Sequence, residues 1–154
     1  MAEYTTVFFP SDKNFVPTND AIERAIAYLN DVYLGHYSAT SQVHAAPRFI
    51  NSGADFDRFV CPACGETVKA HDGSDWWYSN MWSNIVEETQ LITVPCCGAS
   101  VPFNELGVSD RTGFATFQID LEGAGEEYIP DADQQAQLDE ILGCNMRYLI
   151  SVFD

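Results

Sequence analysis

The chain reads GFATFQIDLE over residues 113–122, and apolar and polar side chains alternate strictly along this stretch. In an extended chain, the odd-numbered apolar residues from Ala115 onward would share one face, and the even-numbered polar residues from Thr116 onward would share the other. This alternation is typical of an antiparallel strand that packs one face on a core and turns the other to water. The sequence therefore predicts a half-buried antiparallel strand at 113–122.

Three other segments are expected to form strands. Residues 4–9 are rich in β-forming side chains and stop at Pro10, and residues 146–153 have a similar character near the end of the chain. A short apolar segment at 48–51 is the third. The polar residues at 36–47 that precede it are expected to form a connection.

Two segments carry helical signals. Thr18 can cap a helix whose apolar residues recur at near-helical spacing, and Gly35 stands where a left-handed residue would end it. A second helix precedes the final strand and ends at Gly143. Outside the cysteine-rich region the order is β-α-β followed by β-α-β. This order resembles a ferredoxin-like sandwich, in which two helices cover one face of a four-stranded antiparallel sheet, so the expected fold class is α+β.

Four of the five cysteines fall into two short motifs, CPACG at residues 61–65 and VPCCG at residues 94–98. The first motif resembles a knuckle of the zinc-ribbon type, because two thiolates three positions apart can face one ion when the chain turns tightly between them. Aligning Pro95 with Pro62 places Cys97 at the position of Cys64 and Gly98 at the position of Gly65. Cys144 stands apart after a predicted helix end and is expected to be a small buried apolar residue.

The second motif departs from the pattern because a valine stands where its first cysteine would be. Cys61, Cys64 and Cys97 are therefore the better specified ligands. Cys96 is the preferred fourth, although neighbouring residues of an extended chain point to opposite faces and a local kink is needed. His71 is the alternative, since a neutral imidazole would complete a Cys₃His site. The sequence predicts one structural Zn²⁺ on these residues.

The chain length is that of one domain, and we expect a single α+β domain over residues 1–154. The segment 59–103 would be an inserted zinc-ribbon-like, zinc-binding module between the second and third strands, where it disturbs neither helix crossover. A further helix is expected at 75–88, between the two cysteine motifs. No internal repeat or low-complexity tract is apparent.

The charge is strongly one-sided, with 23 acidic residues against 7 basic ones and a net charge of −16. Such a surface repels phosphate groups, so a basic protein is the expected partner and nucleic acid is not. The N-terminus lacks the features of a signal peptide, and no apolar run approaches the roughly 20 residues of a membrane span. We expect a cytoplasmic protein without a membrane partner, whose cysteines bind metal rather than form disulfides. Its oligomeric state is not indicated.

Common catalytic motifs such as HExxH, GxSxG and the phosphate-binding loop are absent from the sequence, and no catalytic residue is predicted. The N-terminal β-α-β segment, the two knuckles and the final helix are together similar to small uncharacterised bacterial zinc-binding proteins of the kind found beside toxin or defence genes. That resemblance implies an acidic, zinc-stabilised protein-interaction protein, in its sharpest form an immunity-type inhibitor of a basic toxin. The alternative is a metal-dependent enzyme with an open zinc site at the same cysteines.

Overall fold

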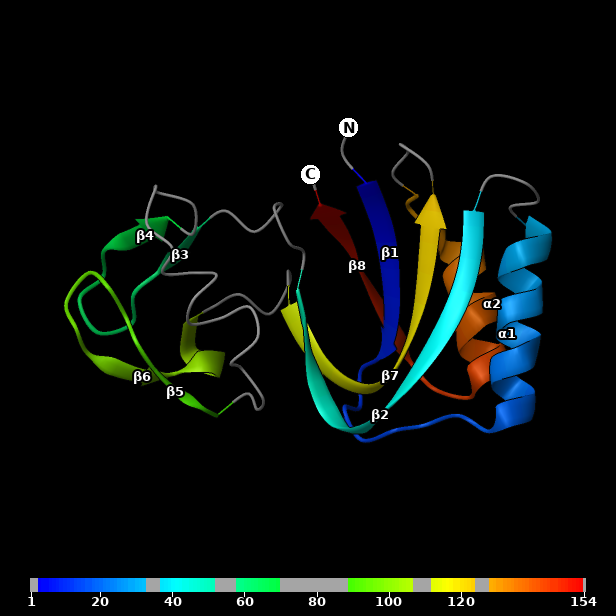
Figure 1. Cartoon of the computed structure of the whole chain (residues 1–154), viewed down its shortest axis with the longest axis horizontal. Coiled ribbons are helices and arrows are strands. Elements are labelled where there is room, and N and C mark those ends of the chain that lie inside the picture. The colour runs from blue at the N-terminus through cyan, green and yellow to red at the C-terminus, as the bar shows by residue number, and fades with distance from the viewer. Residues whose placement is uncertain are drawn as a thin grey trace.

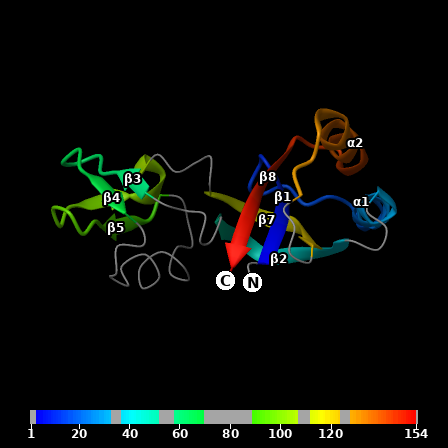
Figure 2. The ribbon, with the colours of Figure 1, turned by 90° about the horizontal axis from the view of Figure 1, so that it is seen from above.

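Two helices and several antiparallel strands make up the described part of the chain, which is therefore α+β (Figure 1). The computed structural model describes residues 3–32, 37–51, 58–69, 89–106, 112–123 and 128–153. A four-stranded sheet with both helices lies at one end of the molecule, and two small hairpins lie at the other (Figure 2).

The four strands of the large sheet are β1 (Glu3–Pro10), β2 (Tyr37–Asn51), β7 (Thr112–Gly123) and β8 (Met146–Phe153). Their spatial order is β2-β7-β1-β8, and every neighbouring pair is antiparallel. The antiparallel strand predicted at 113–122 is confirmed as β7. Phe117 and Ile119 on its apolar face are fully buried, whereas Gln118 between them is partly exposed.

Both helices cover one face of this sheet (Figure 1). α1 (Asn19–Val32) begins as predicted after Thr18, whose hydroxyl accepts a hydrogen bond from the N–H of Ala21 at 3.2 Å. The buried residues of α1 lie on one stripe: Ala21, Ile22, Ala25 and Leu29. They share a core with Phe117 of β7 and with Leu138 of α2 (Ala132–Leu142). Gly35, the expected end of α1, lies outside the described residues.

The ends of α2 are set by local hydrogen bonds. The carboxylate of Asp131 accepts the N–H of Gln134 at 2.8 Å, and the side-chain carbonyl of Gln134 accepts the N–H of Asp131 at 2.9 Å. This reciprocal pair is a capping box. At the other end Gly143, the predicted end of the helix, adopts a left-handed φ of 78°, and its N–H donates to the carbonyl of Asp139.

Replacing Asp131 by alanine should lower the free energy of unfolding by about 1 kcal/mol, because the N-terminal N–H groups of α2 lose their acceptor. Urea denaturation followed by circular dichroism measures this change. Asp133→Ala is the matched control, since Asp133 carries the same charge in the first turn of α2 and is exposed. Equal losses in the two variants would show that charge, and not the capping box, stabilises this end.

The polar connection expected at 36–47 is wrong for its described part, because residues 37–47 belong to β2. β2 is an edge strand of 15 residues that pairs with β7 along most of its length. Its backbone is held by hydrogen bonds to β7. Few apolar side chains are needed, and Ala39 is the one buried residue described before the register shift. Pattern alone therefore detects only the apolar end at 48–51.

The register between β2 and β7 shifts between Val43 and Arg48. A bulge of this kind bends the strands that carry it. Figure 1 shows β2 and β7 curving together on the side away from the helices. Ile50 of the curved part packs with Val7 and Leu149 in a second, smaller core on that side. The sheet therefore has apolar contacts on both faces.

The two hairpins at the far end are short. They consist of β3 (Arg58–Val60) with β4 (Thr67–Lys69), and of β5 (Leu91–Thr93) with β6 (Ser100–Pro102), followed by the 3₁₀ helix η2 (Phe103–Leu106). We call β3–β4 and β5–β6 the cysteine hairpins. The strands of each hairpin bury one central cross-strand pair, Phe59 with Val68 and Ile92 with Val101.

Three aromatic rings connect the cysteine hairpins to the large sheet. Phe103 of η2 lies 5.1 Å from the ring of Phe49 on β2 and 5.7 Å from the ring of Phe114 on β7, measured between centroids. Phe49 and Phe114 are 5.5 Å apart. The hairpins thus share one core with the curved part of the β2–β7 ribbon.

The helix predicted at 75–88 lies outside the described residues. Of the helices that the structure describes, none combines the length and the apolar character needed to cross a bilayer.

Candidate metal centre

The two cysteine hairpins turn in the same way. In the first, the N–H of Cys61 donates to the carbonyl of Glu66 at 2.8 Å, and the N–H of Gly65 donates to the carbonyl of Cys61 at 2.9 Å. Residues 94, 98 and 99 repeat both bonds in the second hairpin at 3.0 Å. Gly65 and Gly98 have φ values of 79° and 74°, a left-handed conformation that glycine adopts without strain. Each turn therefore requires the glycine that ends its motif.

This correspondence is an internal repeat, so the expectation of no repeat is wrong. Strands, turns and buried residues recur at the same spacing from residue 58 and from residue 91. Few side chains are identical, because each hairpin needs only three buried residues and a turn glycine. The proline and glycine shared by the two motifs were the signal that could have extended the match to the flanking strands.

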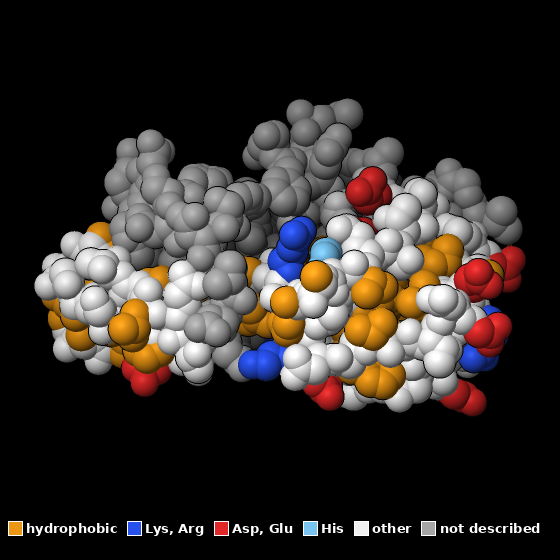
Figure 3. Space-filling view, turned by 60° about the horizontal axis from the view of Figure 1, so that its bottom comes forward, with side chains coloured by type: hydrophobic (Ala, Val, Ile, Leu, Met, Phe, Trp, Pro, Cys, Tyr) orange, Lys and Arg blue, Asp and Glu red, His pale blue; other side chains and the backbone are white. Residues whose placement is uncertain are grey.

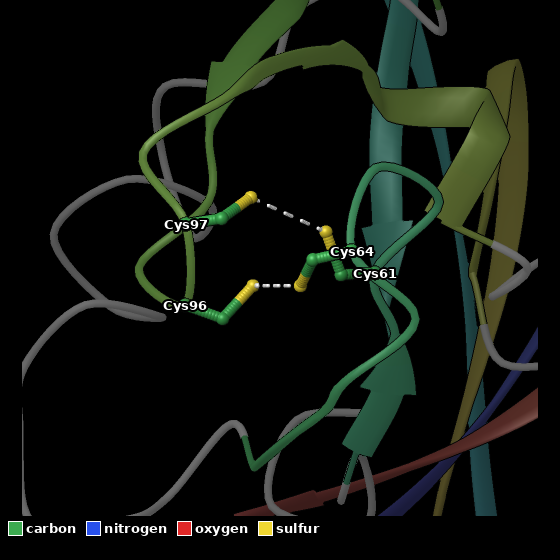
Figure 4. Close-up of side chains that lie close together, drawn as sticks. All are labelled: Cys61, Cys64, Cys96 and Cys97. Carbon is green, nitrogen blue, oxygen red and sulfur yellow. Dashed lines mark hydrogen bonds between the residues drawn. The ribbon is translucent and has the colours of Figure 1, made fainter.

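Four sulfur atoms meet between the two turns (Figure 4). The ligand atoms of Cys61, Cys64, Cys96 and Cys97 all lie within 4.8 Å of one another. The Sγ atoms of Cys61 and Cys97 are 3.9 Å apart, and those of Cys64 and Cys96 are 3.4 Å apart. A tetrahedral Zn²⁺ with bonds of about 2.3 Å to four thiolates separates the sulfurs by about 3.8 Å. The four cysteines therefore fit a single tetrahedral metal ion.

Cys96 belongs to this cluster although it directly precedes Cys97. Both residues lie in the turn between β5 and β6 and not in a strand, so their side chains are not forced to opposite faces. The turn supplies the local kink that the preferred ligand set required. His71, the alternative fourth ligand, lies outside the described residues.

Val94 explains why the second hairpin uses adjacent cysteines. It stands where Cys61 stands in the first hairpin and is fully buried in the hairpin core. Cys96 stands where Ala63 stands in the first hairpin. The second hairpin thus places an apolar side chain in the core at position 94. Its first thiol comes two residues later in the turn, directly before Cys97.

The environment of the sulfurs differs between positions. Cys61 is buried, Cys96 is half-buried, and Cys64 and Cys97 are exposed. Burial raises the pKa of the Cys61 thiol, but hydrogen bonds from the backbone of Cys64 and Ala63 and from neighbouring thiols lower that pKa to about 7. Burial, hydrogen bonds among the thiols and the negative charge of Cys61 raise the pKa of Cys96 to about 12.

The pKa of Cys61 is lowered and that of Cys96 is raised, which indicates that the clustered thiols do not all ionise together. Four thiolates within a few ångströms of one another repel each other unless a cation neutralises them. A divalent metal ion does so, since it deprotonates the thiols that it binds. The donor set therefore suits a metal ion that prefers sulfur, such as Zn²⁺.

Cys144 lies away from the cluster, next to α2. It is half-buried against the core between the helices and the sheet, and its Sγ donates to the sulfur of Met146 at 3.5 Å. Burial, together with the negative charges of Asp139 and Asp12, raises its pKa to about 11. Its surroundings are those of a small apolar residue and not those of a ligand.

A hollow of about 320 Å³ lies beside Cys96 and is lined by Thr67, Val68, Lys69, Pro95 and Cys96. None of these five residues carries a carboxylate or an imidazole, the groups that most often transfer protons at a catalytic zinc.

Comparisons of the chain with protein-family models, with curated proteins and with solved structures find no match.

Proposed function

We propose that this chain is an acidic, zinc-stabilised binding protein whose partner is a basic protein. The convergence of four sulfur atoms carries the proposal. Cys61, Cys64, Cys96 and Cys97 would fill all four positions of a tetrahedral Zn²⁺. A catalytic zinc site usually keeps one position open for water, whereas a structural site is closed. The arrangement therefore favours a structural metal.

The cysteine hairpins need such a metal. Each has strands of three residues and buries one cross-strand pair, and an isolated two-stranded hairpin is marginally stable at best in water. Zn²⁺ on two cysteines from each hairpin would join the two turns and supply folding free energy. We therefore assign residues 59–103 as a zinc-binding insertion of the zinc-ribbon type within one domain.

The sheet supports a ferredoxin-like arrangement for the remainder of the chain. The order β2-β7-β1-β8, with antiparallel neighbours and both helices on one face, is the order expected from two successive β-α-β units. The insertion would then enter after β2 and leave before β7, the one connection in which no helix crosses the sheet. The cytoplasm, which keeps thiols reduced, is the compartment that suits this site.

The charge supports a basic protein as partner. The chain carries 16 more negative than positive charges. Figure 3 shows acidic side chains at several separate places on one face of the molecule. An excess of negative charge steers a positively charged partner and repels nucleic acid. An immunity-type inhibitor that occludes a basic bacterial toxin is the sharpest form of this proposal.

Native mass spectrometry of protein purified from its source cells at low salt tests the proposal. We expect one Zn²⁺ per chain and a basic protein retained in a fixed ratio, because opposite charges hold the complex at low ionic strength. The complex should dissociate as salt is raised. Alkylation of the native, zinc-loaded chain should spare the four clustered cysteines, and a chelator should expose them.

Other outcomes of this experiment separate the alternatives. Absence of zinc would contradict the metal site. One zinc with one of the four cysteines alkylated in the native chain would show an open coordination position and favour a metal-dependent enzyme. A companion that is acidic, or whose binding does not depend on salt, would contradict the proposed partner.

A further inference from the structure

A groove of about 260 Å³ lies on the face of the sheet away from the helices. Residues from all four strands line it, among them Val7, Phe49, Ile50, Asp120, Glu122 and Ser151. The bulge in β2 creates this groove, because the curved part of β2 brings Phe49 and Ile50 over the residues of β1 and β7. Its volume is below the roughly 300–1,000 Å³ of pockets for drug-sized ligands, and suits one extended side chain.

One part of the groove carries two carboxylates. The register pairs Val7 with Asp120 and Thr5 with Glu122, so both acids lie on the groove face of β7. The carboxylate of Asp120 accepts a hydrogen bond from the side-chain amide of Gln42 at 2.6 Å and another from that of Gln118 at 2.8 Å. These neutral donors fix the carboxylate in place without cancelling its charge.

The hydroxyl of Ser151 supplies a second, independent sign of a ligand. Ser151 is 4% exposed and pairs with Thr5 across β8 and β1, on the groove face. Within the described part of the chain its side chain has no hydrogen-bond partner, whereas more than nine in ten buried polar groups have one. A ligand in the groove would satisfy this hydroxyl.

The remaining walls are apolar. Val7 and Ile50 are each 5% exposed and form part of the smaller core, and Phe49 is partly buried. The ring of Phe49 is held by Phe103 and Phe114, whose centroids lie 5.1 and 5.5 Å away. The groove thus combines apolar walls with fixed negative charge.

We infer that this groove binds the side chain of a lysine on the basic protein partner, an inference that rests on the proposed function. The methylene stem would lie against Val7, Ile50 and Phe49. The ammonium group would donate to Glu122 and Ser151, which pair with Thr5 from opposite sides, and the fixed negative charge of Asp120 would attract it.

Titration of the zinc-loaded full chain with the peptide acetyl-Gly-Lys-Gly-amide, followed by methyl NMR, tests the inference. We expect the methyl resonances of Val7 and Ile50 to shift with saturation. The same peptide with an acetylated lysine keeps the stem and loses the charge, and it should bind at least about tenfold more weakly. Asp120→Asn and Glu122→Gln should each weaken binding of the lysine peptide by a similar factor.

Two further variants serve as controls. Glu23→Gln makes the same change of charge on the exposed side of α1, beyond the other face of the sheet, and should leave the peptide affinity unchanged. Ser151→Ala should weaken peptide binding without lowering the urea midpoint, because the hydroxyl has no internal partner to lose. A lowered urea midpoint would show that the Ser151 hydroxyl stabilises the fold and is not a ligand-binding group.

Several results would overturn the inference. They are the absence of methyl shifts, equal binding of the acetylated peptide, and equal weakening by Glu23→Gln, which would indicate a general effect of charge. Tighter binding of a free diamine such as cadaverine than of the peptide would assign the groove to a small molecule.

The inference and the proposed function can fail separately. A chain that holds zinc and a basic partner but does not bind the lysine peptide disproves lysine binding in the groove and leaves the proposed function intact. Peptide binding by a chain that carries no zinc when purified from its source cells disproves the zinc-stabilised function alone.

Discussion

Replacing Cys64 by serine should abolish zinc binding and unfold the two cysteine hairpins. Cys64 is exposed, so the substitution removes a thiolate without opening a cavity in the hairpin core. Structural zinc contributes about 10–16 kcal/mol to the folding of zinc-finger peptides at neutral pH, more than hairpins of this size can replace. Zinc content after dialysis should fall from one per chain to nearly none. The dispersed amide NMR signals of residues 58–69 and 89–106 should collapse.

Cys144→Ser is the matched control for this prediction. Cys144 carries the same thiol but packs beside α2, away from the four clustered sulfurs. It should keep one zinc per chain and dispersed signals from both hairpins. A Cys64→Ser chain that retained its zinc and its hairpin signals would contradict a four-thiolate site and would favour a ligand from another part of the chain, with His71 as the first candidate.

Truncation of Phe117 to alanine should have the largest effect on the sheet. Phe117 is fully buried between β7 and the two helices, in the core that also holds Leu29 and Leu138. Replacing a buried phenylalanine by alanine costs about 3–5 kcal/mol, because apolar contacts are lost and a cavity remains. Since a domain of this kind has a total stability of about 5–15 kcal/mol, a large share would be lost. Urea denaturation followed by circular dichroism measures it.

Val43→Ala is the control for Phe117→Ala. Val43 pairs with Phe117 across β2 and β7 but is 56% exposed, so its truncation removes little buried surface. Its expected effect is within about 0.5 kcal/mol, as for surface substitutions in general. Similar losses in the two variants would show that the core lies elsewhere than between β7 and the helices.

Sequence pattern predicted most elements of the sheet and its helices. The alternation at 113–122, the cap at Thr18 and the glycine at 143 each report a local preference of the backbone. Such preferences act over a few residues and can be read without knowing what packs against them. β2 was missed over residues 37–47 because an edge strand depends on hydrogen bonds to β7, which lies far away in the sequence.

The candidate site was predicted in its residue types and not in its geometry. The two cysteine motifs indicate thiolate ligands at residues 61, 64 and 97, and Cys96 is the preferred fourth ligand although extended geometry would require a local kink there. The structure brings Cys96 to the other three sulfurs, because adjacent cysteines in a turn are not bound by the alternation of a strand. The groove beside Asp120 has no signal in the sequence at all.

By itself, then, the sequence determined the α+β composition, the strands and helices with clear periodicity, and the two cysteine motifs. These features depend on residues that are neighbours in the chain. Only the tertiary structure decided the full length of β2, the placement of four sulfurs within 4.8 Å, and the groove on the open face of the sheet. Each of these arises where segments distant in sequence meet, and their positions are set by strand register and core packing rather than by local preference.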